Sequence, residues 1–160
     1  MAKQYWIGDI LVGSHDEEVV ELCGWVHRTR GSNKIRFLVL RDSTGSLQCV
    51  IKKGAVDDEC FDALSGALIE SSVRVTGKVI RTDREHGYEL SVSTGNVVGA
   101  VNPNSPFPIT ESAMAEADGG ETEFLLDNRH LYLRTSRMTK MLKIRSVSYT
   151  HLTLPTMLPV

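Results

Sequence analysis

The sequence predicts a mainly β protein, a five-stranded barrel with one short helix between its third and fourth strands. Residues 19–30, 35–41, 47–52, 71–82 and 88–99 alternate apolar and polar side chains, the pattern of half-buried strands. The turn-forming sequences GSNK and DSTG separate the first three segments. Residues 57–69 instead space Cys60, Phe61, Leu64 and Leu68 as on one face of a helix, with acids in the first turn.

Three strands, a helix and two further strands, in that order within residues 19–99, are typical of an OB-fold, a small Greek-key barrel. The glycines agree with this fold. Gly24, Gly45, Gly77 and Gly95 fall inside or between the expected strands, where a tightly coiled barrel needs bulges and close backbone approach. We therefore expect residues 1–101 to form one OB-fold domain.

The remaining residues are expected to form an extended linker and a helix. Residues 102–127 contain several prolines and the doublet GG, so we interpret them as a linker or hinge without a core of its own. Met138, Met141 and Leu142 would share one face of a basic helix beginning near residue 128. The β-branched residues and two prolines of residues 148–160 should end that helix near residue 147.

The composition bounds the function. Of the 160 residues, 41% are hydrophobic and 24% charged, as in ordinary globular proteins. No apolar run reaches the roughly 18 residues that span a bilayer. The first residues lack the layout of a secretory signal, so we expect a cytoplasmic protein. Three cysteines at wide spacing, and five histidines of which no two stand at metal-ligand spacing in the sequence, indicate no disulfide, no zinc and no other metal site.

The distribution of charge favours a specific anionic partner. A net charge of −2 argues against indiscriminate binding of nucleic acid. Cations nevertheless gather within residues 27–41, and again within residues 129–145. In an OB-fold the second and third strands commonly bind oligonucleotides, and the first of these clusters would lie there.

The candidate binding residues carry a ring, cations and polar groups. Phe37 would face outward if Leu38 and Leu40 line the barrel, whereas a register slip of one residue would bury its ring. Arg28 and Arg30 share a face of the first strand, and guanidinium groups pair with phosphates and stack on bases. Two further residues, Gln48 in the third strand and Glu89 in the fifth, would add hydrogen-bonding groups beside the ring.

These residues lie in sequences that resemble a known family. The run GWVHRTRGSNKIRFLVLRDSTGSLQCVI, followed by FPI and LLDNRHLYLRT, resembles the amino-terminal part of class IIb aminoacyl-tRNA synthetases. It is most similar to the archaeal type of asparaginyl-tRNA synthetase. The aspartyl and lysyl enzymes share the first pattern, and the last two motifs favour asparagine.

The resemblance implies a barrel that binds the tRNA anticodon. In relatives the phenylalanine, here Phe37, stacks on the central uridine and the glutamine, here Gln48, bonds to the edge of that base. Arg30 corresponds to a contact with the anticodon loop, and Glu89 to a glutamate near the first anticodon base. Trp25 is instead expected to pack inside the barrel with Leu40.

The resemblance also implies that the parent protein is a dimeric enzyme that uses ATP and Mg²⁺ to attach asparagine to tRNA. Residues 128–147 would begin its catalytic domain and part of the dimer helix, while residues 148–160 match nothing in the family and would be a non-native tail. No catalytic residue and no cofactor site is expected in this chain. The alternatives are an aspartate-tRNA ligase fragment, a stand-alone single-stranded nucleic-acid binder, and an OB-fold that binds proteins. The basic helix could also bind a membrane or a partner.

Overall fold

The computed structural model describes residues 3–13, 15–83, 87–109 and 122–153. The chain divides into two compact units, Met1–Phe107 and Pro108–Val160. No helix among the described residues is long and apolar enough to cross a membrane.

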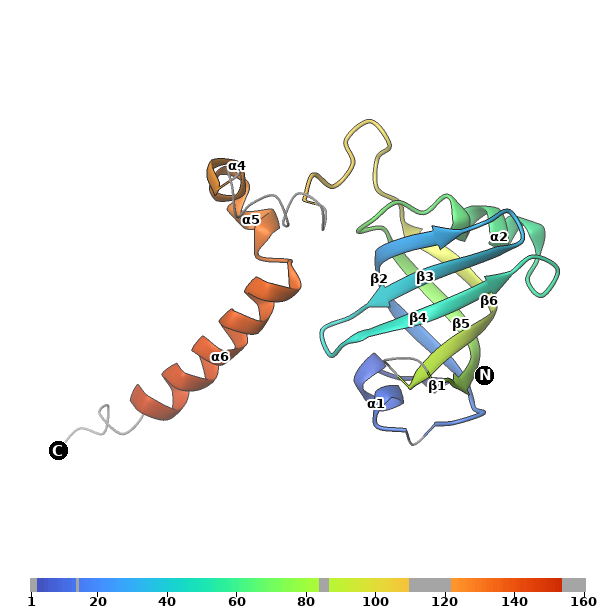
Figure 1. The fold of residues 1–160 in the computed structure, drawn as a ribbon, viewed down its shortest axis with the longest axis horizontal. Coiled ribbons are helices and arrows are strands. Elements are labelled where there is room, and N and C mark those ends of the chain that lie inside the picture. Colours follow the sequence, from blue (N-terminus) through green and yellow to red (C-terminus); the bar gives the residue numbers. More distant parts are fainter. Residues whose placement is uncertain (1–2, 14, 84–86, 110–121, 154–160) are drawn as a thin grey trace. The chain divides into compact units, whose positions relative to one another are not determined.

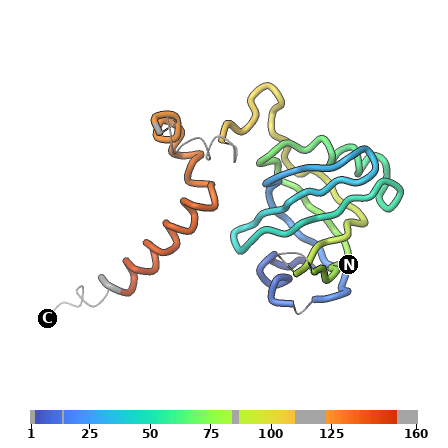
Figure 2. The backbone as a smooth tube through the Cα atoms, viewed as in Figure 1, coloured from blue at the N-terminus to red at the C-terminus, as the bar shows by residue number. Residues whose placement is uncertain are grey.

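The first unit is a closed β-barrel (Figure 1). Its strands are β2 (Val19–Gly31), β3 (Ile35–Arg41), β4 (Ser46–Lys52), β5 (Ser72–Arg81) and β6 (Tyr88–Gly99). They pair in the order β2-β3-β4-β6-β5, and β5 pairs back with β2, a closure that the backbone in Figure 2 follows. Because β6 lies parallel to β4 while the other pairs of the barrel are antiparallel, the connectivity is that of a Greek key. The predicted OB-fold is confirmed.

Alternating side chains from every barrel strand fill one core. Leu22, Leu38, Leu47, Val75 and Leu90 are each at most 1% exposed and belong to a single cluster. The helix α2 (Asp58–Ser65) connects β4 to β5 and adds Phe61 and Leu64 to that cluster. The predicted helix extended four residues further, to residue 69, but α2 ends at Ser65 with Gly66 as its C-cap.

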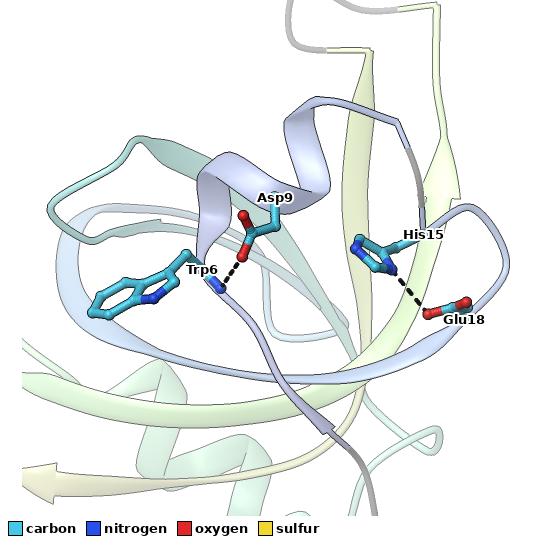
Figure 3. Close-up of polar contacts among 4 residues, drawn as sticks. All are labelled: Trp6, Asp9, His15 and Glu18. Atoms are coloured by element: carbon cyan, nitrogen blue, oxygen red, sulfur yellow. Dashed lines mark hydrogen bonds and ion pairs between the residues drawn. The ribbon is translucent and has the colours of Figure 1, made fainter.

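Two elements at the start of the chain complete the barrel and were not predicted. Strand β1 (Lys3–Gln4) pairs in parallel with β2, and helix α1 (Ile7–Leu11) follows it. Ile7 and Ile10 are fully buried in the core cluster. The backbone N–H of Trp6 donates to Asp9 Oδ2 over 3.1 Å at the first turn of α1 (Figure 3). Helix α1, with 5 residues, is too short to show helical periodicity in the sequence.

The β3–β4 turn holds α1 in place. Asp42 Oδ1 accepts hydrogen bonds from the backbone N–H groups of Thr44 (2.6 Å) and Gly45 (2.9 Å), and from the Thr44 hydroxyl (2.6 Å). Its Oδ2 accepts from the Ile7 N–H over 2.8 Å. Partial burial raises the pKa of Asp42, but these bonds together outweigh it and lower the pKa below 3.8.

A second small cluster orders the segment between α1 and β2. The rings of Tyr5 and His15 lie 4.2 Å apart between centroids, and His15 Nδ1 lies 3.0 Å from Glu18 Oε2 (Figure 3). The ammonium group of Lys3 lies 5.1 Å from the centre of the Tyr5 ring. These contacts join β1 to the beginning of β2.

The second unit is helical where it is described. It contains α4 (Thr122–Asp127), α5 (Arg129–Tyr132) and α6 (Ser136–Thr153). Its buried hydrophobic side chains include Ile109, Leu125 and Met138. Part of the predicted linker, residues 110–121, lies outside the described residues, as do the charged turn at residues 84–86 and residues 154–160 of the predicted tail. Helix α4 occupies the last six residues of that linker.

The expected end of the last helix near residue 147 is wrong. Helix α6 continues to Thr153, two positions before Pro155. β-Branched residues cost a helix only a few tenths of a kcal/mol each. The hydroxyl groups of Ser148 and Thr150 donate to the Ile144 and Ser146 carbonyl oxygens, each over 2.9 Å. Their hydrogen-bonding groups are thus satisfied within the helix.

Candidate nucleic-acid interface

The strand register places the five predicted site residues on one outer face of the barrel. Arg30 pairs with Phe37 and Arg28 pairs with Val39 across β2 and β3. Val39 in turn pairs with Gln48 on β4, and Gln48 with Glu89 on β6. The side chains between them point inward.

The burial of β3 settles the register that the sequence left open. Leu38 is 1% exposed and Leu40 is fully buried, so Phe37 and Val39 face outward, as one of the two alternatives predicted. Phe37 is half-buried on that face, which leaves part of its ring accessible. A ring that is held by its neighbours and still accessible suits stacking with a flat ligand.

A chain of hydrogen bonds crosses the face beside this ring. Arg30 Nη2 donates to Gln48 Oε1 over 3.1 Å, and Gln48 Nε2 donates to Glu89 Oε2 over 2.9 Å. The carboxylate of Glu89 and the guanidinium group of Arg30 therefore orient the amide of Gln48 from its two ends. An amide has two N–H donors and two acceptor lone pairs, so one of each is left to bond with a ligand.

The same arginine also lies over the ring. Arg30 Cζ is 5.7 Å from the centre of the Phe37 ring, a distance at which the cation and the π-system attract each other by about 0.5–1 kcal/mol at an exposed site. Arg28 is exposed one row further along β2. One guanidinium group thus lies over the ring and a second lies one row away on the same strand, and such groups suit phosphates.

A hollow adjoins Phe37 on the β6 side. It has a volume of about 180 Å³ and is lined by Phe37 and Glu89 together with Ile35, Val50, Lys52, Ile80 and Ser91. Sequence reasoning missed the last five. Lys52 could have been predicted from the sequence, because the alternation that starts from Gln48 places it on the outer face. Ile80 and Ser91 depend on the pairing of β6 with β4 and β5, for which the local sequence carries no signal.

The prediction that Trp25 packs inside the barrel is wrong. Its side chain is 42% exposed on the outer face. The pairing of β2 with β3 shifts register between Val26 and Arg28, and this bulge reverses the alternation that would have pointed Trp25 inward. The inward position goes to Gly24, where an added Cβ would lie 2.5 Å from the carbonyl oxygen of Arg41. Only glycine fits there.

Comparison with known proteins agrees with the fold. Residues 20–98 match the family of OB-fold nucleic acid binding domains. The asparagine-tRNA ligase of Thermoplasma acidophilum is 39% identical over 145 residues, which are 89% of this chain and 31% of that protein. The corresponding ligase of Koribacter versatilis is 40% identical over 135 residues, 84% of this chain and 29% of that protein.

A solved structure has the same fold. The crystal structure of asparaginyl-tRNA synthetase from Pyrococcus horikoshii superposes with a TM-score of 0.78 at 30% identity, over 98% of this chain and 36% of that one. This chain carries the OB-fold domain of the asparaginyl-tRNA synthetase family. It spans about a third of the length of these relatives.

No three or more His, Cys, Asp or Glu side chains among the described residues are placed to hold an ion.

Proposed function

We propose that the outer face of β2, β3, β4 and β6 recognises the anticodon loop of a tRNA. The observation that carries this proposal is the hydrogen-bond chain from Arg30 through Gln48 to Glu89, beside the accessible ring of Phe37. A ring supplies stacking to any base, whereas an oriented amide distinguishes bases by their edges. The two together suit a base that is splayed out of a loop.

The central anticodon base is proposed to stack on Phe37 and to bond with Gln48. Uridine presents an N–H donor and carbonyl acceptors on its edge, which match the acceptor and donor that remain on the amide. Cytidine presents a donor in place of one acceptor, so it mismatches an amide that is held in one orientation. Arg28 and Arg30 would contact the phosphates of the loop, and Glu89 the neighbouring base.

The expected energies indicate a selective but modest binder. A base stacked on an aromatic side chain contributes about 1–3 kcal/mol, and a good bidentate base contact contributes a similar amount. Phosphate contacts make the affinity depend strongly on salt. The domain alone should therefore discriminate anticodon loops well at low salt while holding them weakly.

The larger protein is proposed to be a homodimeric, ATP-dependent asparagine-tRNA ligase, with residues 1–101 as its anticodon domain and residues 102–127 as a hinge. Residues 128–147 would begin its catalytic domain. The sequence identity to asparagine-tRNA ligases supports asparagine as the amino acid that the larger protein attaches. Aspartate remains the second candidate, because the anticodon of its tRNA shares the first two letters. The cytoplasmic location, the non-native tail and the absence of catalysis by this chain alone stay predictions.

Binding of two RNA stem-loops tests the proposal. One carries the anticodon GUU and the other GCU, and both are titrated at low salt into the native chain and into Phe37→Ala. We expect GUU to be preferred and Phe37→Ala to weaken its binding about 5- to 150-fold, the equivalent of one lost stack. Phe124→Ala, a matched change at a 38% exposed ring on α4, should leave binding unchanged.

The contrary results point to the other candidates. Equal affinity for both stem-loops and for a polypyrimidine strand would favour a general single-stranded nucleic-acid binder. No affinity for any RNA at low salt, where phosphate contacts are strongest, would favour an OB-fold that binds proteins.

A further inference from the structure

The exposed indole of Trp25 lies on the same outer face as Phe37. Because of the bulge between Val26 and Arg28, β2 presents Trp25 outward before it and Arg28 and Arg30 outward after it. The ring of Trp25 is 42% exposed, an unusual exposure for the largest apolar side chain. A second aromatic group is therefore accessible in line with the first.

The register gives the separation of the two aromatic positions. Trp25 pairs with Arg41 and Arg30 pairs with Phe37, so the two rings are separated by four residue steps along β3, from Phe37 to Arg41. At about 3.4 Å per residue, that is about 14 Å along the sheet. The row formed by Arg28 and Val39 lies between them.

The surroundings of Trp25 suit a nucleotide. Arg28 is exposed between the two rings, where a phosphate of a strand that runs from one ring to the other would lie. Arg41, which pairs with Trp25 in the ladder, donates from Nη2 to Glu70 Oε1 over 2.6 Å and is anchored by that ion pair. The side chain of Arg41 beside the indole is thus held in one conformation, so less conformational entropy is lost when a base stacks there.

We infer that Trp25 is a second stacking position, which takes a nucleotide of the loop outside the anticodon triplet. This inference rests on the proposed function. Consecutive nucleotides of a stacked strand rise about 3.4 Å each. A position about 14 Å from the central base consequently lies beyond both of its immediate neighbours. The recognised segment is then longer than three nucleotides, and a flanking base contributes to the affinity.

The indole reports on its own occupancy by fluorescence. The chain contains two tryptophans, Trp6 and Trp25, so Trp6→Phe leaves Trp25 as the single indole. We expect its emission to be quenched when the GUU stem-loop binds. The quenching should be lost with a stem-loop that is abasic at every loop nucleotide outside the triplet on both sides. In the matched variant Trp25→Phe, the emission of Trp6 should not change.

Affinity gives a second readout. Trp25→Ala should weaken binding of the intact stem-loop about 5-fold or more, as expected for a lost stack. It should have no effect on the stem-loop that lacks the flanking bases, and Trp25→Phe should restore most of the affinity. If Trp25 had only a structural role, Trp25→Ala would weaken the binding of both RNAs equally.

The outcomes separate this inference from the proposed function. If GUU is preferred and the preference depends on Phe37, but Trp25 emission does not change, Trp25 is no stacking position and the anticodon proposal stands. If Trp25→Ala weakens the intact and the abasic stem-loops alike, the inference is also overturned. If neither stem-loop binds, the proposed function and this inference both fail.

Discussion

Nε2 of Gln48 donates a hydrogen bond to Oε2 of Glu89 over 2.9 Å, across two strands that lie parallel in the barrel. The two residues are separated by 41 positions in the chain. They meet because β6 enters the sheet between β4 and β5. The Greek-key connection therefore builds the polar part of the proposed site as well as closing the barrel.

Glu89→Gln should reduce base discrimination without unfolding the domain. The substitution keeps the shape of the side chain but removes the charge that fixes the amide of Gln48, so we expect the preference for GUU over GCU to fall about 10-fold. The free energy of unfolding should change by no more than about 0.5 kcal/mol. Titrations of both stem-loops and urea denaturation measure these quantities. Glu59→Gln, at an exposed position on α2, is the control for binding and should leave the preference for GUU unchanged.

Asp42→Asn should make the domain less stable and less sensitive to acid. The folded state lowers the pKa of Asp42 below 3.8, so its stabilising contribution is complete above the unfolded pKa and is lost as the pH falls through the folded value. We expect a loss of about 1–3 kcal/mol at pH 7, from weaker hydrogen bonds to Ile7, Thr44 and Gly45. Urea denaturation between pH 5 and pH 2 should show a shallower decline for the variant. An unchanged slope would contradict the assignment.

The contribution of Cys49 to the stability of the domain should be lost at alkaline pH. Complete burial raises the pKa of its thiol from 9.0 to about 12. The contribution of the neutral thiol is therefore complete below pH 9 and is lost as the pH rises toward 12. Between pH 8 and pH 10 the difference in unfolding free energy between the native chain and Cys49→Ala should shrink by about 1 kcal/mol.

Alkylation provides an independent check on that thiol. Cys49 is fully buried, whereas Cys23 and Cys60 are partly exposed. Mass spectrometry after brief iodoacetamide treatment at pH 8 should find Cys49 unmodified in the folded chain and modified in urea. Modification of Cys49 in the absence of urea would show that the barrel opens on the timescale of the reaction.

Gly77→Ala should destabilise the barrel strongly. An added Cβ would lie 2.2 Å from the backbone carbonyl oxygen of Ser91, at the point where β5 and β6 shift register. Because backbone atoms on both sides would have to move, we expect a loss of about 3 kcal/mol in the free energy of unfolding. Thermal denaturation tests this. Gly66→Ala, where the nearest atom would be 3.3 Å from the new methyl group, should cost less than about 1 kcal/mol.

Local patterns of the sequence were sufficient for the barrel strands. The expected bounds of β3 and β6 agree with the structure, those of β2 and β4 differ by one residue at one end, and those of β5 differ by one residue at each end. Alternation also placed Leu38 and Leu40 inside, one of the two registers considered. Each of these features depends on neighbours within a few positions, because a strand buries every second side chain regardless of its partner.

The tertiary structure alone decided where the strands meet and which positions break the alternation. The bulge after Val26 sent Trp25 outward, and the parallel pairing of β4 with β6 joined Gln48 to Glu89. The sequence by itself determined the fold class and the residue types of the proposed site, and it left two registers open for β3. It did not determine the bulge or the pairing, because both depend on backbone hydrogen bonds between distant segments. Every residue type accepts such bonds and every type except proline donates them, so the side chains carry no signal for the pairing.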